Sequence, residues 1–207
     1  QAFERRRNLI VGLAKEIPER FYDVGIEEEH AVTFAAGLAA GGMKPFCNIY
    51  SSFSQRAYDQ ILHDVALQEL PVVLCLDRGG LVGEDGATHH GCYDMSAYRS
   101  IPGAVIAAPK DELELKNMMY SAMLAETGPY IIRYPRGYGE GVDWQSPEYQ
   151  SLESGKGEKV LDGTDVAVFA AGPFVYRALE AAQRLKGEKG WNPSIYNIRY
   201  VKPLDQD

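Results

Sequence analysis

The sequence is poor in the patterns that mark disulfide-rich, membrane-spanning or nucleic-acid-binding proteins. Its three cysteines, Cys47, Cys75 and Cys92, show no CxxC spacing, so we expect small reduced core residues and no disulfide or metal site. No apolar run approaches the roughly 18 residues needed to span a bilayer. The net charge of −8 argues against nucleic acid or an anionic membrane as the main partner. An anionic substrate would therefore need a local cluster of Arg or Lys.

The sequence also lacks a starting methionine, a signal-peptide pattern, internal repeats and low-complexity tracts. It begins at Gln1 and ends on Val-Lys-Pro-Leu-Asp-Gln-Asp. We therefore expect a piece of a longer cytoplasmic protein. Its composition, 45% hydrophobic and 24% charged residues, is typical of a globular domain with a substantial core.

What the sequence does contain is an alternation of strand-like and helix-like segments. This alternation predicts an α/β fold with a mainly parallel sheet. The predicted strands of the first part are 8–11, 22–26, 45–49, 72–76, 104–107 and 130–133. The predicted helices between them are 28–40, 54–66 and 111–125, the last with Asp111 as its N-cap.

The composition changes between Gly137 and Gly163, where Gly, Ser, Glu, Pro and Tyr dominate, and this change predicts a linker. A strand, a helix and a strand then follow at 165–170, 175–186 and 194–198. One βαβ unit buries too little surface to be stable, so we expect part of a second domain. The predicted organisation is a domain at 1–137, a linker at 138–163 and an incomplete second α/β domain at 164–207.

Three acids and a histidine, Glu27 to His30, open the predicted helix 28–40. Acids are favourable in a first turn because they oppose the positive end of the helix dipole. If one of them is buried, desolvation and repulsion by its neighbours favour its protonated form and make it a candidate proton carrier. The spacing alone does not choose among the three acids.

A second group of candidates follows the predicted strand 45–49. Tyr50, Phe53 and Arg56 offer a hydroxyl, an aromatic face and a cation close together in sequence. Ligands of parallel α/β folds gather at the carboxyl ends of strands, which favours a binding role. The alternative is a packed aromatic side chain and a solvated arginine.

A glycine-rich loop at 79–91 carries Asp85, His89 and His90. Glycine lets a backbone approach a ligand closely. His89, four residues after Asp85, suits acid–base work because histidine titrates near neutral pH. Two alternatives stay open: a metal site built from Asp85, His89 and His90, which adjacent histidines rarely allow, and a merely flexible loop.

Other residues carry weaker signals. Arg136 follows the predicted strand 130–133 and could pair with a phosphate, although a lone arginine is more often a surface charge. His30 and His63 lie within predicted helices, and we expect structural roles for both. Glu84-Asp85-Gly86 matches part of the Gly-Asp-Gly signature of diphosphate–magnesium sites, but Glu84 stands where the signature needs glycine, so we reject that assignment.

The same segments carry a set of motifs in a fixed order: Asp23 to Gly37, Ile49 to Ala66, Asp77 to His89, Arg133 to Gly137 and Val201 to Asp205. Together they resemble the 1-deoxy-D-xylulose-5-phosphate synthase family. Members of this family are thiamine-diphosphate enzymes of the transketolase superfamily. The resemblance implies a pyrimidine-binding domain, a linker and the start of a C-terminal transketolase-like domain. It also implies a homodimeric transferase that decarboxylates pyruvate and joins the two-carbon unit to glyceraldehyde 3-phosphate. The product would serve the biosynthesis of isoprenoids, thiamine and pyridoxal.

The resemblance also implies roles for individual residues. Glu28 hydrogen-bonds the aminopyrimidine ring of thiamine diphosphate, Phe53 stacks on that ring, and Ile26 contacts the cofactor. His89 is a catalytic residue, and the residues facing the acceptor substrate are Tyr50, Arg56, Arg78, Asp85 and Arg136, whose arginines suit its phosphate. Mg²⁺ and the diphosphate are implied to bind an N-terminal domain that this sequence does not contain, so no metal ligand is expected here.

The chain departs from the family pattern at several positions. The family has Ala-Glu-Gln at 27–29, Thr at Ser52 and Ala at Glu84, so Glu29 and Glu84 add negative charge near the implied site. A family loop is missing at Gly12–Leu13, where we expect a gap in the chain, with Cα atoms much farther apart than about 3.8 Å. We expect no turnover by this chain alone, because half of the implied cofactor site is absent.

Two other functions stay open. One is another enzyme of the transketolase superfamily, either a transketolase or the β subunit of a pyruvate dehydrogenase. The motifs at 50–66 and 77–89 favour the synthase. The other is a non-catalytic paralogue that keeps the fold for assembly, a role that would not require Glu28, Arg78, His89 and Arg136.

Overall fold

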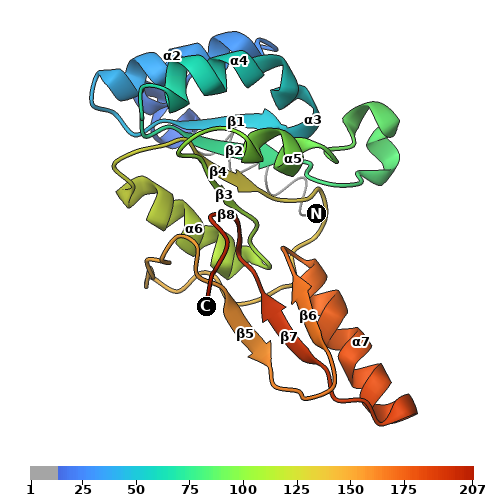
Figure 1. The fold of residues 1–207 in the computed structure, drawn as a ribbon. Helices are drawn as coiled ribbons and strands as arrows, with labels where there is room; N and C mark the ends of the chain where they lie inside the picture. Colours follow the sequence, from blue (N-terminus) through green and yellow to red (C-terminus); the bar gives the residue numbers. More distant parts are fainter. Residues whose placement is uncertain (1–13) are drawn as a thin grey trace.

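Two sheets organise residues 14–207, the part of the chain that the computed structural model describes (Figure 1). The larger sheet has the order β1-β2-β4-β3-β8: Phe46–Tyr50, Val73–Asp77, Tyr130–Arg133, Val105–Ala107 and Tyr200–Lys202. Its first four strands are parallel, and β8 is antiparallel to β3. The smaller sheet has the order β5-β7-β6: Glu158–Leu161, Ser194–Asn197 and Ala167–Ala170. The predicted α/β fold with a mainly parallel sheet is confirmed.

Helices cover both faces of the larger sheet (Figure 1). On one face lie α2 (Glu28–Ala40), a helical run over 51–66 and α5 (Asp94–Arg99). The run consists of α3 (Ser51–Ser54), the 3-10 turn η2 (Gln55–Ala57), α4 (Tyr58–Gln60) and the π-helical η3 (Ile61–Ala66). On the other face lies α6 (Glu112–Leu124), and α7 (Phe174–Lys189) packs on the smaller sheet. Short 3-10 turns lie at Pro18–Arg20 (η1), Gly83–Asp85 (η4) and Ala87–His89 (η5).

The alternation of side chains along β2 builds a core on each face. Leu74 and Leu76 join the cluster under α2 and the 51–66 run, whereas Val73 and Cys75 join the cluster under α6. Every residue of β2 up to Leu76 is therefore apolar, as expected for a strand buried on both faces. Burial raises the pKa of the Cys47 and Cys75 thiols to about 12, which keeps both protonated at neutral pH.

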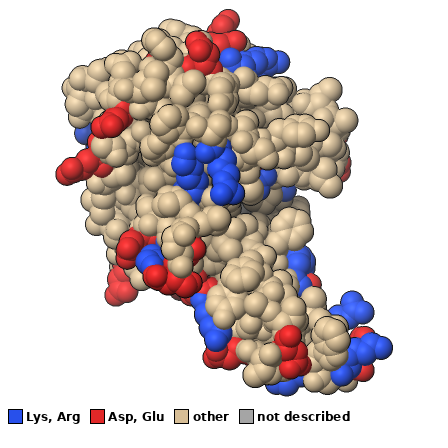
Figure 2. Space-filling model, in the orientation of Figure 1, with Lys and Arg blue, Asp and Glu red and all other residues tan. Residues whose placement is uncertain are grey.

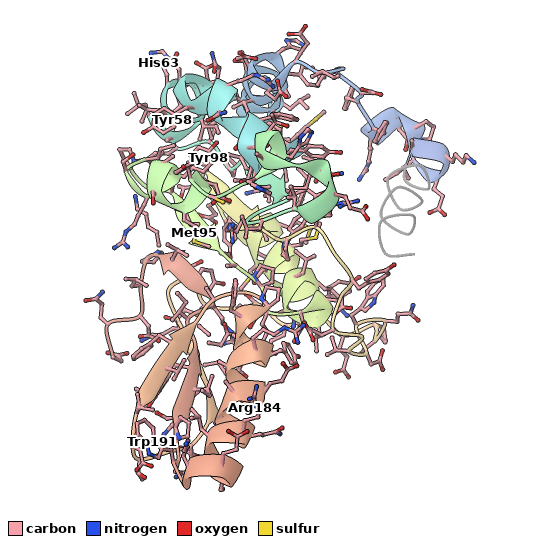
Figure 3. All side chains as sticks on the ribbon, turned by 90° about the vertical axis from the view of Figure 1, so that its right-hand side faces the viewer. Tyr58, His63, Met95, Tyr98, Arg184 and Trp191 are labelled. Carbon is pink, nitrogen blue, oxygen red and sulfur yellow. The ribbon has the colours of Figure 1, made fainter. Side chains whose placement is uncertain are left out.

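Aromatic stacking joins the helices of the first face. Tyr58 and Tyr98 lie side by side between α4 and α5 (Figure 3), with ring centroids 6.1 Å apart. The Tyr98 hydroxyl donates a hydrogen bond to Ser54 Oγ at 2.6 Å. The 51–66 run is thereby fixed to α5 as well as to the sheet.

Most predicted elements are confirmed, several at their predicted ends. Helix 28–40 and strand 130–133 match α2 and β4, and the other predicted strands from 45 to 107 shift by about a residue. The predicted cap is confirmed, because the Asp111 carboxylate accepts a hydrogen bond from the Glu114 N–H at 2.8 Å. The predicted strand 8–11 and the expected gap at Gly12–Leu13 lie outside the described residues.

The predicted strand 22–26 is wrong. Gly25 has a φ of +73°, and its N–H donates to the Asp23 carboxylate at 3.0 Å, so the backbone turns where a strand would continue. Tyr22 and Ile26 are exposed, so this segment also has no apolar face to bury.

One short helix, α5, and two short strands, β5 and β8, were not predicted. Of these, β5 lies within the predicted linker, and its sequence, Glu-Lys-Val-Leu, is half charged. The expectation that all three cysteines are core residues is wrong for Cys92, which is exposed before α5. No helix within residues 14–207 is long and apolar enough to cross a membrane.

Candidate active site

The carboxyl ends of three parallel strands bring the candidate residues to one edge of the larger sheet. Tyr50, the last residue of β1, is in register with Asp77 of β2, and Leu76 of β2 is in register with Arg133 of β4. Segments that leave these ends, including the loop 79–91, therefore start side by side. This is the edge at which open parallel sheets bind ligands.

Glu28 is the buried acid of the acidic turn. It is the first residue of α2 and only 8% exposed, whereas Glu27 and Glu29 are exposed. Its Oε1 lies 3.1 Å from Nη1 of Arg56. His30, expected to pack within its helix, is exposed and stacks on Phe34 with centroids 5.9 Å apart.

Arg56 joins the acid to an aromatic cluster. Its guanidinium lies over the Phe53 ring, with Cζ 4.8 Å from the centroid. Phe53 stacks on Tyr50 at 5.9 Å and meets His89 edge-on at 5.0 Å. The predicted residues Glu28, Arg56, Phe53, Tyr50 and His89 thus form a continuous chain of contacts. Ile26, predicted to contact a cofactor, is 87% exposed two residues before Glu28.

Arg78 and Arg136 form the cationic part of the site. Arg78 is buried, has a φ of +61°, and lies over the Tyr50 ring at 3.7 Å. A non-glycine residue in this left-handed region is uncommon and costs about 1–3 kcal/mol, a strain typical of functional sites. Nε of Arg78 donates to Asp85 Oδ2 at 2.8 Å, and Nε of Arg136 lies 3.4 Å from the same oxygen.

The two arginines act on Asp85 electrostatically. The Arg78 hydrogen bond, with smaller effects from the charges of Arg78, Arg136 and His89, holds the pKa of the Asp85 carboxyl below its ordinary value. Glu84, which departs from the family pattern, is exposed and lies 3.6 Å from Nη2 of Arg136. Both acids of this loop therefore face a cation that was predicted to bind phosphate.

The two adjacent histidines make different contacts. Nδ1 of His89 lies 2.9 Å from the Thr88 hydroxyl, whereas Nδ1 of His90 accepts the Val82 N–H at 3.2 Å. Among the residues that the structure describes, no group of three or more His, Cys, Asp or Glu side chains could hold a metal ion. The fourth histidine, His63, lies on the outer surface of the larger lobe, the part built around the larger sheet (Figure 3), with Nδ1 3.1 Å from Oδ1 of Asp64.

Three residues below the site were missed by sequence reasoning: the buried Ser51 and Asp94, and Arg133, whose side chain is 16% exposed. Asp94 Oδ2 accepts from Ser51 Oγ at 2.9 Å and from Arg133 Nε at 2.8 Å. Asp94 resembles an ordinary first-turn acid of a short helix, and no local signal marks its partner 39 residues away.

The negative charge of the chain is not spread evenly. Figure 2 shows one face of the molecule with a broad uncharged surface, a compact group of cations near its middle and acids mainly toward its edges. At the candidate site, Arg78 and Arg136 give the local cation cluster that an anionic substrate needs, although the net charge of the chain is −8.

Comparisons with known proteins give a consistent assignment. The family model described as "Transketolase, pyrimidine binding domain" matches residues 5–141, and "Transketolase, C-terminal domain" matches residues 155–207. The 1-deoxy-D-xylulose-5-phosphate synthase of Bacteroides thetaiotaomicron is 54% identical over 195 residues, which are 94% of this chain and 30% of the relative. Synthase 1 of Geobacter sulfurreducens is 54% identical over 198 residues, 96% of this chain and 31% of the relative. The chain thus spans about a third of the length of these relatives.

Solved structures show the same fold. A split-gene transketolase, described as an inactive beta4 tetramer, aligns with a TM-score of 0.81 and 29% identity over 93% of this chain and 61% of that chain. Transketolase of Pichia stipitis aligns with a TM-score of 0.74 and 22% identity over 88% of this chain and 27% of that chain. The second likeness supports the fold alone.

Proposed function

The chain belongs to the transketolase pyrimidine-binding domain family, and on this premise we propose that it is part of a thiamine-diphosphate-dependent 1-deoxy-D-xylulose-5-phosphate synthase. The observation that carries the proposal is the buried carboxylate of Glu28, which is joined through the Arg56 guanidinium to the Phe53 ring. The names of the relatives at 54% identity support the same activity.

The residues around Glu28 fit the aminopyrimidine ring of thiamine diphosphate. A buried carboxylate and a half-buried aromatic face, both within reach of one guanidinium, suit a flat heterocycle with a polar ring nitrogen. In this proposal Glu28 binds the ring nitrogen, Phe53 stacks on the ring and Ile26 adds an apolar contact. When bound, thiamine diphosphate supplies the carbanion-stabilising chemistry that pyruvate decarboxylation requires.

The other side of the cluster fits the acceptor, glyceraldehyde 3-phosphate. Arg78 and Arg136 would bind its phosphate, which then replaces Asp85 as their anionic partner or shares them with it. His89 would hold or move a proton at the acceptor carbonyl, with the Thr88 contact at Nδ1 leaving Nε2 for this exchange. Tyr50, Asp85 and Arg56 would complete the acceptor site.

The proposal extends to the protein as a whole. We propose a pyrimidine-binding domain at 1–137, a linker at 138–163 and part of a C-terminal domain at 164–207, which the matches at 5–141 and 155–207 support. Mg²⁺ and the diphosphate would bind elsewhere in a cytoplasmic homodimer. Its product would feed the synthesis of isoprenoid precursors, thiamine and pyridoxal.

The test is a synthase assay of the full-length protein with pyruvate, glyceraldehyde 3-phosphate, thiamine diphosphate and Mg²⁺. We expect CO2 release and formation of 1-deoxy-D-xylulose 5-phosphate, and no turnover by residues 1–207 alone. Glu28→Ala should lower kcat at least about 100-fold, the scale expected for loss of a proton-transferring group. The exposed neighbour Glu29 gives the matched control, since Glu29→Ala should change kcat little. A Glu28→Ala enzyme with the wild-type rate would refute the role of the acid and the proposed function with it.

A second candidate is a subunit of a split transketolase, favoured by the structure that covers 93% of this chain and is described as an inactive beta4 tetramer. Such a protein would transfer a two-carbon unit between sugar phosphates without releasing CO2 from pyruvate. A full-length protein with neither activity would instead fit a non-catalytic paralogue.

A further inference from the structure

Asp94 lies at the centre of a buried polar network below the proposed acceptor site. It is the first residue of α5, and its side chain is 2% exposed. One carboxylate oxygen accepts from Ser51 Oγ and Arg133 Nε, and the other accepts from the Met95 N–H at 2.8 Å. Ser51 directly follows Tyr50, so this carboxylate links the ends of β1 and β4, which lie on either side of β2.

Arg133 extends the network to the loop that carries Asp85 and His89. Its Nη2 donates to the Gly91 carbonyl at 3.2 Å, and its guanidinium lies against Gly79. The two ends of the loop are joined by backbone bonds between Gly80 and Gly91 at 2.8 and 2.9 Å. Gly79, Gly80 and Gly91 thus form the neck of the loop, where its two ends meet. The Asp94–Arg133 pair contacts this neck and fixes where the loop leaves the sheet.

The packing at this neck permits little movement. A Cβ on Gly79 would lie 2.8 Å from Cζ of Arg133, and a Cβ on Gly91 would lie 2.3 Å from Ser51 Oγ and 2.5 Å from the Arg78 carbonyl oxygen. Real Cβ atoms do not approach other atoms so closely, so the backbone, the guanidinium and the serine hydroxyl interlock. Arg78 lies directly before this neck and is the residue with the strained φ of +61°.

We propose that Asp94 and Arg133 are positioning residues for the acceptor half of the site. They touch neither substrate nor cofactor. Through Ser51 they hold its neighbour Tyr50, and through Gly79 and Gly91 they hold Arg78, Asp85 and His89. A shift of about 1 Å in such groups is enough to reduce a rate by as much as 100-fold, so one buried pair can control acceptor binding. The inference rests on the proposed synthase function.

The chain offers a matched control for a purely structural role. Glu114 and Arg199 form a second buried pair at 2.7 Å, with side chains 3% and 19% exposed, against 2.8 Å, 2% and 16% for Asp94 and Arg133. The Glu114 pair joins α6 to the segment after β7, away from the loop 79–91. Loss of either pair should destabilise the protein, but only loss of the Asp94 pair should alter the acceptor site.

The experiment compares Asp94→Asn and Glu114→Gln in the full-length enzyme. For Asp94→Asn we expect KM for glyceraldehyde 3-phosphate to rise by about 10-fold or more, with KM for pyruvate and the Kd of thiamine diphosphate within about threefold of wild type. Glu114→Gln should lower Tm comparably and leave all three constants within about threefold. Equal effects of the two variants, or equal effects of Asp94→Asn on acceptor and pyruvate, would overturn the proposal.

Ser51→Ala provides a milder second variant, because it removes one hydrogen bond and leaves the ion pair. We expect it to raise KM for the acceptor by about threefold with a small change in Tm. If Asp94→Asn does not fold, an unchanged acceptor KM in Ser51→Ala counts against the proposal. A wild-type enzyme without synthase activity would instead defeat the proposed function, so the two failures are distinguishable.

Discussion

At the residue scale, Asp85 is the group whose charge the site controls most directly. The hydrogen bond from Arg78 lowers its pKa below the ordinary 3.8. A carboxyl with a lower pKa in the folded state stabilises the fold above its unfolded pKa, and this contribution is lost as the pH falls through the folded value. Asp85 should therefore stabilise the chain at neutral pH and cease to do so in strong acid.

We expect Asp85→Asn to lower the free energy of unfolding at pH 7, and the difference from wild type to shrink as the pH falls below 3.8. Urea unfolding of the chain from pH 7 to pH 3 measures this difference. Asp59→Asn, at an exposed aspartate of α4, is the control and should show little effect. A difference that stays constant across this range would contradict the prediction.

Individual residues also show where sequence reasoning succeeds and where it stops. The buried acid among Glu27 to Glu29 was identified through the family motif, and the structure buries that acid, Glu28. Asp94 and Arg133 could not be paired in advance, because they lie 39 residues apart and only the parallel order of β2, β4 and β3 brings them together. The pairing of Arg56 with Glu28, 28 residues apart, was missed because it depends on the packing of α2 against the 51–66 run.

At the scale of elements, α6 depends on a cap that also contacts α7. The Asp111 carboxylate accepts the Glu114 N–H at 2.8 Å with one oxygen and the Tyr176 hydroxyl at 2.9 Å with the other. Asp111→Ala should lower the free energy of unfolding by about 1–2 kcal/mol, because both bonds are lost.

Urea unfolding of Asp111→Ala and Tyr176→Phe separates the two contributions. Tyr176→Phe removes only the contact with α7, so its effect should be the smaller of the two. If Tyr176→Phe destabilised the chain as much as Asp111→Ala, the cap itself would contribute nothing.

Elements with strong local signals were predicted best. Helix α2 has acids in its first turn and an Ala-rich body, and strands β2 and β4 are short apolar runs. The missed strands β5 and β8 form only because distant segments pair with them, β5 with β7 and β8 with β3. The wrong strand at 22–26 shows the reverse case, in which a local Asp–Gly turn prevails over an apolar pattern.

At the scale of the whole molecule, a buried charge cluster joins the two lobes, one built around the larger sheet and the other around the smaller sheet. Glu114 of α6 accepts hydrogen bonds from three residues. They are Asn197 at the end of β7, Arg199 between β7 and β8, and Lys110 just before α6. Asn197 is fully buried. Removal of this carboxylate leaves two partly buried cations, Lys110 and Arg199, to share the more exposed Glu158.

Glu114→Ala should therefore lower the free energy of unfolding by about 3–5 kcal/mol, the scale for breaking a buried ion pair. Calorimetry should show a lower Tm and, because the contact between the two lobes is weakened, a broader transition. Arg177→Ala, which removes an exposed pair with Glu180, should change Tm little. An unchanged Tm in Glu114→Ala would mean that the cluster does not hold the lobes together.

The last strand has a consequence for how the chain is made. Ile106 of β3 pairs with Lys202 of β8, so the edge of the larger sheet is closed by residues synthesised almost a hundred positions later. Until those residues leave the ribosome, β3 has unpaired backbone groups along one side and can join a strand from another nascent chain. Folding of the larger sheet thus finishes only after β5, β6 and β7 have been translated, and a chaperone that shields this edge would act during that interval.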